Sequence, residues 1–262
     1  MLLSLKINFM DLKNKKIILI GGAGLIGSYT VEKLLNKSVK EIIIYDNFTR
    51  GKIDNIKNSL KDSRVKIYDE GGDILQKDIL NKALKNVDGV CHFAALWLLQ
   101  CHEYPESAFE TNVRGTFNVM EACRINKVKK LIYSSSASVY GDAIHSPMRE
   151  DHPYLNKNFY GATKICCEAL LRSYYYRYNL NYLGLRYMNV YGPRQDYNGA
   201  YIAVMMRMID NIQRGKRPKV IGTGNEGFDF VSVKDCAEAN ICALESEKKN
   251  EFYNVGTGKK LH

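Results

Sequence analysis

The sequence lacks any hydrophobic run of the roughly 20 residues that a membrane-spanning helix requires. Its opening segment, 1–10, is interrupted by Lys6 and Asn8 and has no small-residue cleavage site, so no signal peptide is predicted. Internal repeats and low-complexity segments are missing as well. We therefore expect no membrane partner.

Paired cysteine motifs are also missing. The seven cysteines are odd in number and contain no C-x-x-C pair, and the adjacent Cys166 and Cys167 cannot easily bridge to each other. The Cys-His pairs at 91–92 and 101–102 do not have the spacing of common zinc sites. These observations predict reduced thiols, a cytoplasmic location and no bound metal.

Positive charge is in excess, with 38 Lys and Arg against 28 Asp and Glu, a net charge of +10. Such an excess favours anionic ligands, including nucleotide diphosphates. Lysines that merely solvate the surface are the simpler interpretation, and basic residues alone rarely specify a partner. We expect no nucleic acid partner.

Short apolar runs alternate with stretches of helical periodicity along most of the chain. This alternation predicts an α/β fold, a Rossmann-type doubly wound parallel sheet with helices on both faces. The predicted strands are 17–20, 41–45, 65–68, 87–93, 130–133 and 182–187, and the predicted helices are 25–35, 109–125 and 160–178.

The rhythm changes after about residue 189, where glycine and proline interrupt it. We predict a helix at 201–213, short strands at 219–221 and 228–231, and a helix at 232–244. The predicted division is a dinucleotide-binding domain, 1–188, and a partial substrate lobe, 189–262. The helix near 232–246 is expected to pack back on the first domain.

A glycine loop with the spacing G-x-x-G-x-x-G, at 21–27, joins the first predicted strand to the first helix. Glycines there permit a tight turn and let backbone N–H groups approach a pyrophosphate at the helix N-terminus. Asp46 follows Gly27 by 19 residues and ends the second strand. A carboxylate at that position binds ribose hydroxyls and repels a 2′-phosphate, which favours NAD over NADP. Arg50 and Lys52 weaken that exclusion, and a turn or capping role for Asp46 is the alternative.

Tyr160 and Lys164 are four residues apart on one predicted helix and therefore lie on the same face. An ammonium group beside a phenol favours the phenolate, which can act as a base. Ser136, from the serine run 134–136, is the candidate hydroxyl that holds the reacting oxygen. Together with the glycine loop, these residues indicate hydride chemistry at a carbon that bears a hydroxyl. A packed aromatic residue is the alternative interpretation of Tyr160.

The ordered set of motifs resembles the extended short-chain dehydrogenase/reductase family, and most closely its nucleotide-sugar epimerase branch, the UDP-glucose 4-epimerase-like proteins. The resemblance runs from about Lys16 to the end of the chain. The matching segments are 21–27, 45–47, 72–74, 92–95, 112–116, the residues Ser136, Tyr160 and Lys164, and 185–194.

The resemblance implies a role for each matched position. Ser136, Tyr160 and Lys164 would be catalytic. The cofactor NAD would be bound by Gly21, Gly24, Leu25, Ile26, Gly27, Asp46, Asn47, Asp73, Ile74, Phe93, Ala94, Ala95, Asn112, Ser134, Tyr160, Lys164 and Tyr187. Within this set, Asp73 and Ile74 would flank the adenine, and Tyr187 would lie near the nicotinamide. A nucleotide-diphosphate sugar would be bound by Trp97, Ser136, Asn189 and Arg194.

Two positions narrow the implied reaction. Dehydratases of the family carry Asp-Glu after the catalytic hydroxyl, whereas this chain has Ala137 and Ser138, which cannot act as acids or bases of that kind. The implied activity is NAD-dependent epimerisation at C4 through a 4-keto intermediate, of the UDP-glucose/UDP-galactose type. Another nucleotide-sugar oxidoreductase, or a catalytically weak nucleotide-binding module, is the alternative.

The chain also departs from the family pattern. Phe228 stands where many relatives carry a phosphate-binding Arg, and the segment 96–99 is unusually apolar. The family usually continues further, so we expect an apparently truncated, smaller C-terminal substrate lobe. Relatives pair two helices into a dimer, which implies a homodimer through 112–125 and 160–178, with Phe117, Met120, Leu170 and Tyr174 as apolar surface.

Overall fold

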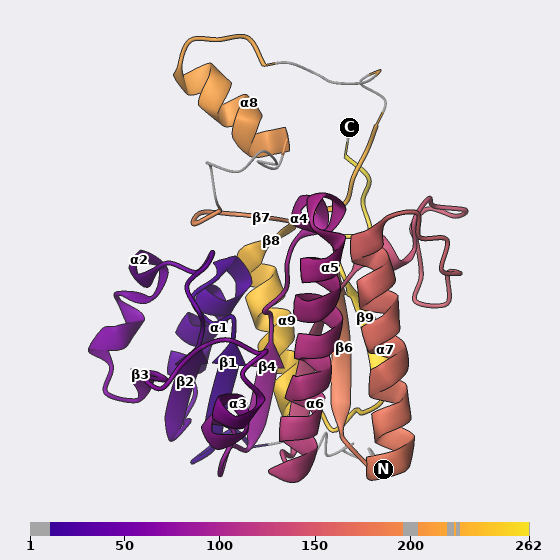
Figure 1. The fold of residues 1–262 in the computed structure, drawn as a ribbon. Helices are drawn as coiled ribbons and strands as arrows, with labels where there is room; N and C mark the ends of the chain where they lie inside the picture. The colour runs from indigo at the N-terminus through magenta and orange to yellow at the C-terminus, as the bar shows by residue number, and fades with distance from the viewer. Residues whose placement is uncertain (1–10, 196–203, 219–222, 224–225, 262) are drawn as a thin grey trace, which may run out of the picture.

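Seven parallel strands form the centre of the molecule (Figure 1). The computed structural model describes residues 11–195, 204–218, 223 and 226–261. The strand order is β3-β2-β1-β4-β5-β6-β9, and every pairing in this sheet is parallel. The order reverses at β1 and β4, which marks the switch point where doubly wound folds bind ligands. The bounds are β1 Lys16–Ile20, β2 Glu41–Tyr45, β3 Val65–Ile67, β4 Gly89–His92, β5 Lys130–Ser136, β6 Tyr182–Tyr187 and β9 Glu251–Val255.

Helices cover both faces of the sheet. The helices α1 (Leu25–Leu35) and α9 (Val233–Glu245) pack on one face. On the other face lie α3 (Lys77–Ala83), α6 (Thr116–Ile125) and α7 (Phe159–Tyr178). The shorter helices are α2 Ile53–Ile56, η1 Ser59–Lys61, α4 Leu98–Glu103, α5 Pro105–Ala108, η2 Phe109–Gly115 and η3 Ala137–Val139.

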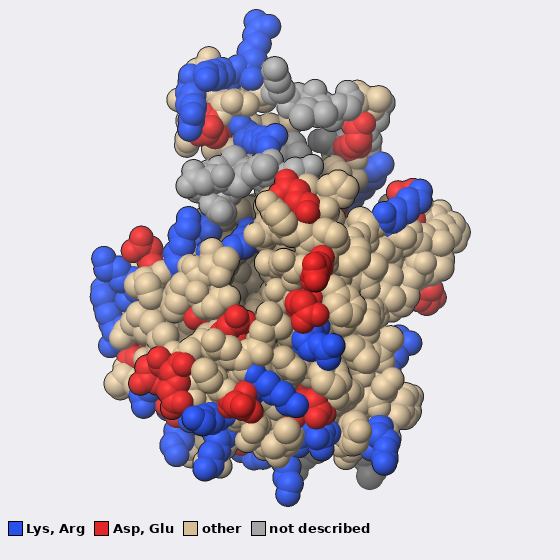
Figure 2. All heavy atoms as spheres, viewed as in Figure 1, with Lys and Arg blue, Asp and Glu red and all other residues tan. Residues whose placement is uncertain are grey.

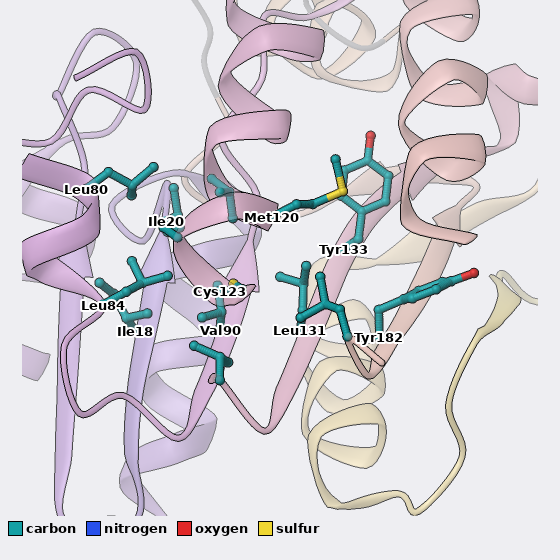
Figure 3. Close-up of a cluster of buried hydrophobic side chains, with 14 of the residues drawn as sticks. Ile18, Ile20, Leu80, Leu84, Val90, Met120, Cys123, Leu131, Tyr133 and Tyr182 are labelled. Carbon is teal, nitrogen blue, oxygen red and sulfur yellow. The ribbon is translucent and has the colours of Figure 1, made fainter. Parts of the chain in front are cut away.

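Alternation along each strand builds the two cores. In β1, Ile18 and Ile20 belong to the core under α3, α6 and α7, whereas Ile17 and Leu19 belong to the core under α1 and α9. Successive side chains of a strand point to opposite faces, so a strand covered on both sides is apolar throughout. Figure 3 shows the first core, where Ile20 lies near Leu80 and Ile18 lies near Leu84. The doubly wound α/β fold predicted from the alternation is confirmed.

Element ends differ from the prediction in two informative places. β5 continues to Ser136 because Ser134, Ser135 and Ser136 pair with 185–187 of β6. The predicted helix at 109–125 begins with a π-helical segment, η2, before α6. In that segment a Cβ at Gly115 would lie 2.4 Å from Ile74 Cδ1, so the helix passes very close to the loop after β3.

A small second layer lies beyond the ends of the strands (Figure 1). β7 (Asn189–Tyr191) pairs in parallel with β8 (Phe230–Ser232), and α8 (Val204–Gln213) lies above them. The predicted strand at 219–221 and the start of the predicted helix at 201–213 lie outside the described residues. The strand predicted at 228–231 begins later, because Phe228 instead forms an isolated antiparallel bridge with Leu261.

The predicted division at residue 188 needs one correction. β9 pairs with β6 from Leu183↔Glu251 to Tyr187↔Val255, so this part of the segment 189–262 belongs to the main sheet. α9 packs against α1. The smaller layer is therefore an excursion between β6 and α9. Among the described residues, no helix combines the length and apolar character needed to span a bilayer.

Candidate active site

The glycine loop forms a backbone cradle at the end of β1. Gly21 has φ +80°, and a Cβ there would lie 2.8 Å from the amide nitrogen of Ala94. A Cβ at Gly27 would lie 2.4 Å from the carbonyl oxygen of Gly21. α1 begins at Leu25 without a side-chain cap, so the first N–H groups of the helix point into the loop with no partner within the helix. This arrangement fits a pyrophosphate, which backbone N–H groups and the positive helix end stabilise.

Asp46 ties the end of β2 to this loop. Its Oδ2 accepts a hydrogen bond from the Ala23 N–H at 2.9 Å, and its Oδ1 accepts one from the Phe48 N–H at 2.9 Å. Burial raises the pKa of Asp46, and these two hydrogen bonds oppose the rise. Gly51 packs on the carboxylate, since a Cβ there would lie 2.7 Å from Oδ1. The structure thus brings Asp46 and the glycine loop together, whereas Asn47 is exposed and accepts from Thr49 N–H at 3.1 Å.

The loops after β3 and β4 close the sides of the cradle. The N–H groups of Phe93 and Ala94 both donate to the Ile20 carbonyl, at 2.8 and 3.1 Å. Ala95, like both of them, is half-buried. The Asp73 carbonyl accepts from the Tyr45 hydroxyl at 2.8 Å, which fixes the loop after β3 beside β2.

Tyr160, Lys164 and the serine run meet where α7 packs on β5. The Lys164 ammonium is buried, donates to the Ser134 carbonyl at 2.7 Å and lies 5.5 Å from the centroid of the Tyr160 ring. Tyr160 is half-buried at the start of α7. Ser136 begins the turn η3, and its Oγ accepts from the Ser138 N–H at 3.1 Å. A phenol, an ammonium and a hydroxyl therefore gather at the end of β5, two strands from the glycine loop.

Charge near this end of the molecule is mixed. Figure 2 shows Lys and Arg interspersed with Asp and Glu over the body, with further basic side chains around α8. α8 and the turn after it contribute Arg207, Arg214 and Lys216. Among the described residues, no group of three or more His, Cys, Asp or Glu has an arrangement that could hold a metal ion.

Comparison with known proteins agrees with this geometry. Residues 17–256 match the model of the NAD dependent epimerase/dehydratase family. The chain belongs to this family. Its cofactor is NAD.

Individual relatives cover most of the chain. A Methanocaldococcus jannaschii protein with a provisional assignment as UDP-glucose 4-epimerase is 38% identical, over 93% of this chain and 77% of its own length. The UDP-N-acetylglucosamine 4-epimerase of Methanobrevibacter ruminantium, solved with UDP-N-acetylmuramic acid, has TM-score 0.89 and 37% identity, over 95% of this chain and 78% of that chain. The UDP-glucose 4-epimerase of Thermus thermophilus, solved with NAD, has TM-score 0.83 and 33% identity, over 94% of this chain and 79% of that chain.

In this epimerase/dehydratase chain, three of the residues predicted to contact the cofactor or the substrate have side chains that bind other residues of the chain. The Tyr187 hydroxyl donates to Asn240 Oδ1 of α9 at 2.7 Å, and burial raises its pKa well above the ordinary value. Tyr187 thus stays a neutral core residue whose side chain lies on the α9 side of the sheet. Its place near the nicotinamide stays a prediction.

Asn112 is the second of these residues. It is buried, accepts from Leu96 N–H at 2.7 Å and donates to the Leu96 carbonyl at 3.0 Å and to Thr163 Oγ1 at 3.3 Å. These bonds use its amide to join the loop after β4 to α7, between Tyr160 and Lys164. The side chain thus holds the loop after β4 against α7. Its predicted contact with NAD stays a prediction.

Arg194 is the third. Its guanidinium donates to Ser28 Oγ at 3.2 Å, pairs with Glu32, and lies 4.3 Å from the centroid of the Tyr29 ring. A positive φ of 73° turns the chain there toward α1. These contacts attach the segment after β7 to α1. The predicted contact of Arg194 with substrate stays a prediction.

The remaining predicted residues stay near the strand ends. Trp97 is the residue before α4, and the Arg50 guanidinium lies 5.0 Å from the centroid of its ring. This contact joins the loops after β2 and β4, the two strands that flank β1. Asn189 is exposed on β7 and donates to the Asp229 carbonyl at 3.3 Å. Ile74 is buried against α6, where its carbonyl accepts from Asn118 Nδ2 at 3.0 Å. Its side chain therefore supports the loop after β3 from the core.

A buried ion pair escaped the sequence analysis. Glu168 of α7 and Arg186 of β6 each expose 2% of their side chain and pair at 2.7 Å, Nη2 to Oε2. The sequence does place Glu168 on the face of α7 that carries Tyr160, because it follows Lys164 by four residues. It does not identify Arg186 as the partner.

Proposed function

We propose that the chain catalyses NAD-dependent epimerisation of a nucleotide-diphosphate sugar at C4, through a 4-keto intermediate, with UDP-glucose and UDP-galactose as the type pair. The observation that carries the proposal is the meeting of Tyr160, Lys164 and Ser136 at the end of β5, beside the cradle for NAD. Epimerisation at C4 needs a group that takes the hydroxyl proton and gives it back, together with a hydride carrier on one side of the sugar.

The site residues divide this work. Bound NAD⁺ supplies an acceptor for the C4 hydride and, once reduced, a donor that returns it. The phenolate form of Tyr160 takes the C4 hydroxyl proton, and the phenol so formed later returns it. The Lys164 ammonium, held by the Ser134 carbonyl at 2.7 Å, stabilises negative charge on that phenol. The Ser136 hydroxyl, at the turn after β5, donates to the oxygen at C4.

The cofactor is held by the residues of the cradle. The N–H groups at the start of α1 receive the pyrophosphate, and Asp46 accepts from the adenosine ribose hydroxyls. The Arg50 guanidinium lies over the Trp97 ring. In that position the guanidinium is held by the ring, so this contact competes with the binding of a 2′-phosphate to Arg50. This geometry supports use of NAD rather than NADP.

Epimerisation is favoured over dehydration by the turn that follows Ser136. Ala137 and Ser138 occupy η3, and the Ser138 hydroxyl bonds to Ser136 at 3.1 Å. Neither residue offers a carboxyl to remove water from a 4-keto sugar. The excursion between β6 and α9, in which β7 begins at Asn189, is proposed to cover the sugar nucleotide.

We also propose that the protein is a cytoplasmic homodimer that pairs α6 and α7 with the same helices of a second copy. Two of the residues expected to form that surface are core residues instead, because Met120 and Tyr174 are buried against the sheet. The apolar side chains that α6 and α7 do expose include Ile125 at 46%, Tyr176 at 78% and Tyr178 at 48%.

The test is direct turnover. Purified protein is incubated with UDP-glucose and, separately, with UDP-N-acetylglucosamine, and the products are followed by proton NMR. We expect the C4 epimer of at least one sugar with no net change in NAD(H). Accumulation of a dehydrated sugar would refute the epimerase assignment. NAD binding without any product would favour the catalytically weak binding module.

A further inference from the structure

The carboxylate of Glu168, one turn after Lys164 on α7, accepts hydrogen bonds from four donor atoms. Glu168 accepts from Arg186 Nε at 2.9 Å and from Arg186 Nη2 at 2.7 Å, a bidentate geometry. It also accepts from the Ser135 hydroxyl at 2.6 Å and from the Tyr154 hydroxyl. Four donors therefore fix one buried carboxylate in a single orientation.

The four donor atoms belong to three residues, which come from separate parts of the chain. Ser135 is on β5, Arg186 on β6, and Tyr154 on the segment that precedes α7. Arg186 Nη1 extends the network to the Tyr140 hydroxyl at 2.8 Å, and that hydroxyl donates to Asn254 Oδ1 of β9 at 2.6 Å. Glu168 thus connects α7 to three adjacent strands of the sheet.

The contacts between α7 and β5 fix the position of the helix along the strand. Tyr160, Lys164 and Glu168 follow each other at four-residue intervals and so lie along one side of α7. On β5, Lys164 contacts the Ser134 carbonyl and Glu168 contacts the Ser135 hydroxyl. These two contacts are one helical turn apart on α7 and one residue apart on β5. Together they restrain both sliding and rotation of the helix against the strand.

We propose that Glu168 is a positioning residue that, through Ser135 and Arg186, sets how Tyr160 and Lys164 of α7 face Ser136 of β5. The inference rests on the proposed function for the roles of Tyr160, Lys164 and Ser136. Arg186 balances the buried negative charge, so the geometry is held without an unpaired carboxylate next to Lys164. A 1 Å displacement of a reacting group can cost about 100-fold in rate, so this restraint acts on turnover.

The first experiment removes one link and leaves the ion pair in place. Ser135→Ala deletes the hydroxyl between β5 and Glu168, and Ser173→Ala is the matched control, since that hydroxyl bonds to the Ala169 carbonyl on the exposed side of α7. We expect kcat of Ser135→Ala to fall about tenfold, with KM and NAD content within about twofold of wild type. A kcat within about twofold of wild type, or a change in KM alone, would overturn the proposal.

A second experiment separates positioning from stability. Glu168→Gln leaves Arg186 buried without its counter-charge and is expected to lower Tm strongly. The double variant Glu168→Gln/Arg186→Met removes both charges, and we expect it to recover most of the Tm but not kcat. Recovery of kcat in step with Tm would assign the pair to stability alone. If neither variant folds, the Ser135→Ala comparison decides.

A third readout is independent of the substrate. In protein labelled with ¹³C-tyrosine, Tyr160→Phe identifies the ring signal of Tyr160. We expect that signal to shift at fixed pH in Ser135→Ala and not in Ser173→Ala. An unchanged signal would contradict positioning by Glu168. Wild-type protein inactive on every nucleotide sugar would instead count against the proposed function and leave this readout intact.

Discussion

His92 makes the stability of the fold sensitive to mild acid. The residue ends β4 and exposes 1% of its surface, and its Nε2 lies 3.0 Å from Thr116 Oγ1. Its Nδ1 has no hydrogen-bond partner among the described residues. Burial lowers the pKa of His92 to about 3, and the Lys164 charge acts in the same direction.

The sign of the effect follows from the lowered pKa. Between pH 6.5 and about 3 the unfolded chain binds a proton at His92 that the folded chain does not. The free energy of unfolding therefore rises with pH across this window. The stability that the neutral His92 contributes is lost progressively as the pH falls below 6.5. At pH 5, which is about 1.5 units below the ordinary pKa of His, the loss from this residue is about 2 kcal/mol.

Urea unfolding at about pH 7.5 and about pH 5 measures this contribution. His92→Gln removes the titrating ring and keeps an amide that can reach Thr116, so the variant should lose about 2 kcal/mol less than wild type between the two pH values. Thr116→Val is the control, because it removes the hydrogen bond and retains the imidazole, and its pH dependence should follow wild type. Equal losses in wild type and His92→Gln would refute the reasoning.

Three further predictions concern the site and the assembly. Calorimetry should find tighter binding of NAD than of NADP, and Asp46→Asn should narrow the difference; tighter binding of NADP to wild type would contradict the role of Asp46. Tyr160→Phe should lower turnover by about 10²–10⁴-fold while NAD binding persists, whereas Lys164→Met should weaken both. Wild-type turnover in Tyr160→Phe would reassign the pair to structure. Light scattering should give twice the chain mass at micromolar concentration, and a monomer would argue against pairing through α6 and α7.

The sequence predicted the sheet well because its strands are short apolar runs separated by helices. Such runs are typical of parallel strands buried on both faces. The glycine loop and Asp46 were also predictable as one site, since both follow adjacent strands whose ends lie at one edge of the sheet.

Side-chain directions could not be predicted in the same way. On β6, Leu183, Leu185 and Tyr187 point toward α9, and Arg186 points toward α7. The register of β6 with β5 decides which side chains of β6 point toward α9 and which point toward α7. A shift of the register by one residue would exchange the two faces. The resemblance implied a position for Tyr187 near the nicotinamide but gave no direction for its side chain, which the register places in the core.

Long-range polar contacts were beyond sequence reasoning. Arg194 reaches Ser28 across 166 residues after a turn with positive φ, and no local pattern predicts that contact. The pair Glu168 and Arg186 joins a helix to a strand, and in isolation both residues resemble ordinary polar positions. Only the packing of α7 on β5 and β6 makes them one buried network.

The fate of the hydrogen at C4 tests the central claim most directly. UDP-glucose deuterated at C4 is incubated with the protein in ordinary water until equilibrium, and the products are analysed by NMR and mass spectrometry. Oxidation and re-reduction at one carbon by tightly held NAD predicts UDP-galactose that keeps the deuterium at C4. Loss of the deuterium to solvent, or its appearance at another carbon of a dehydrated sugar, would contradict the account.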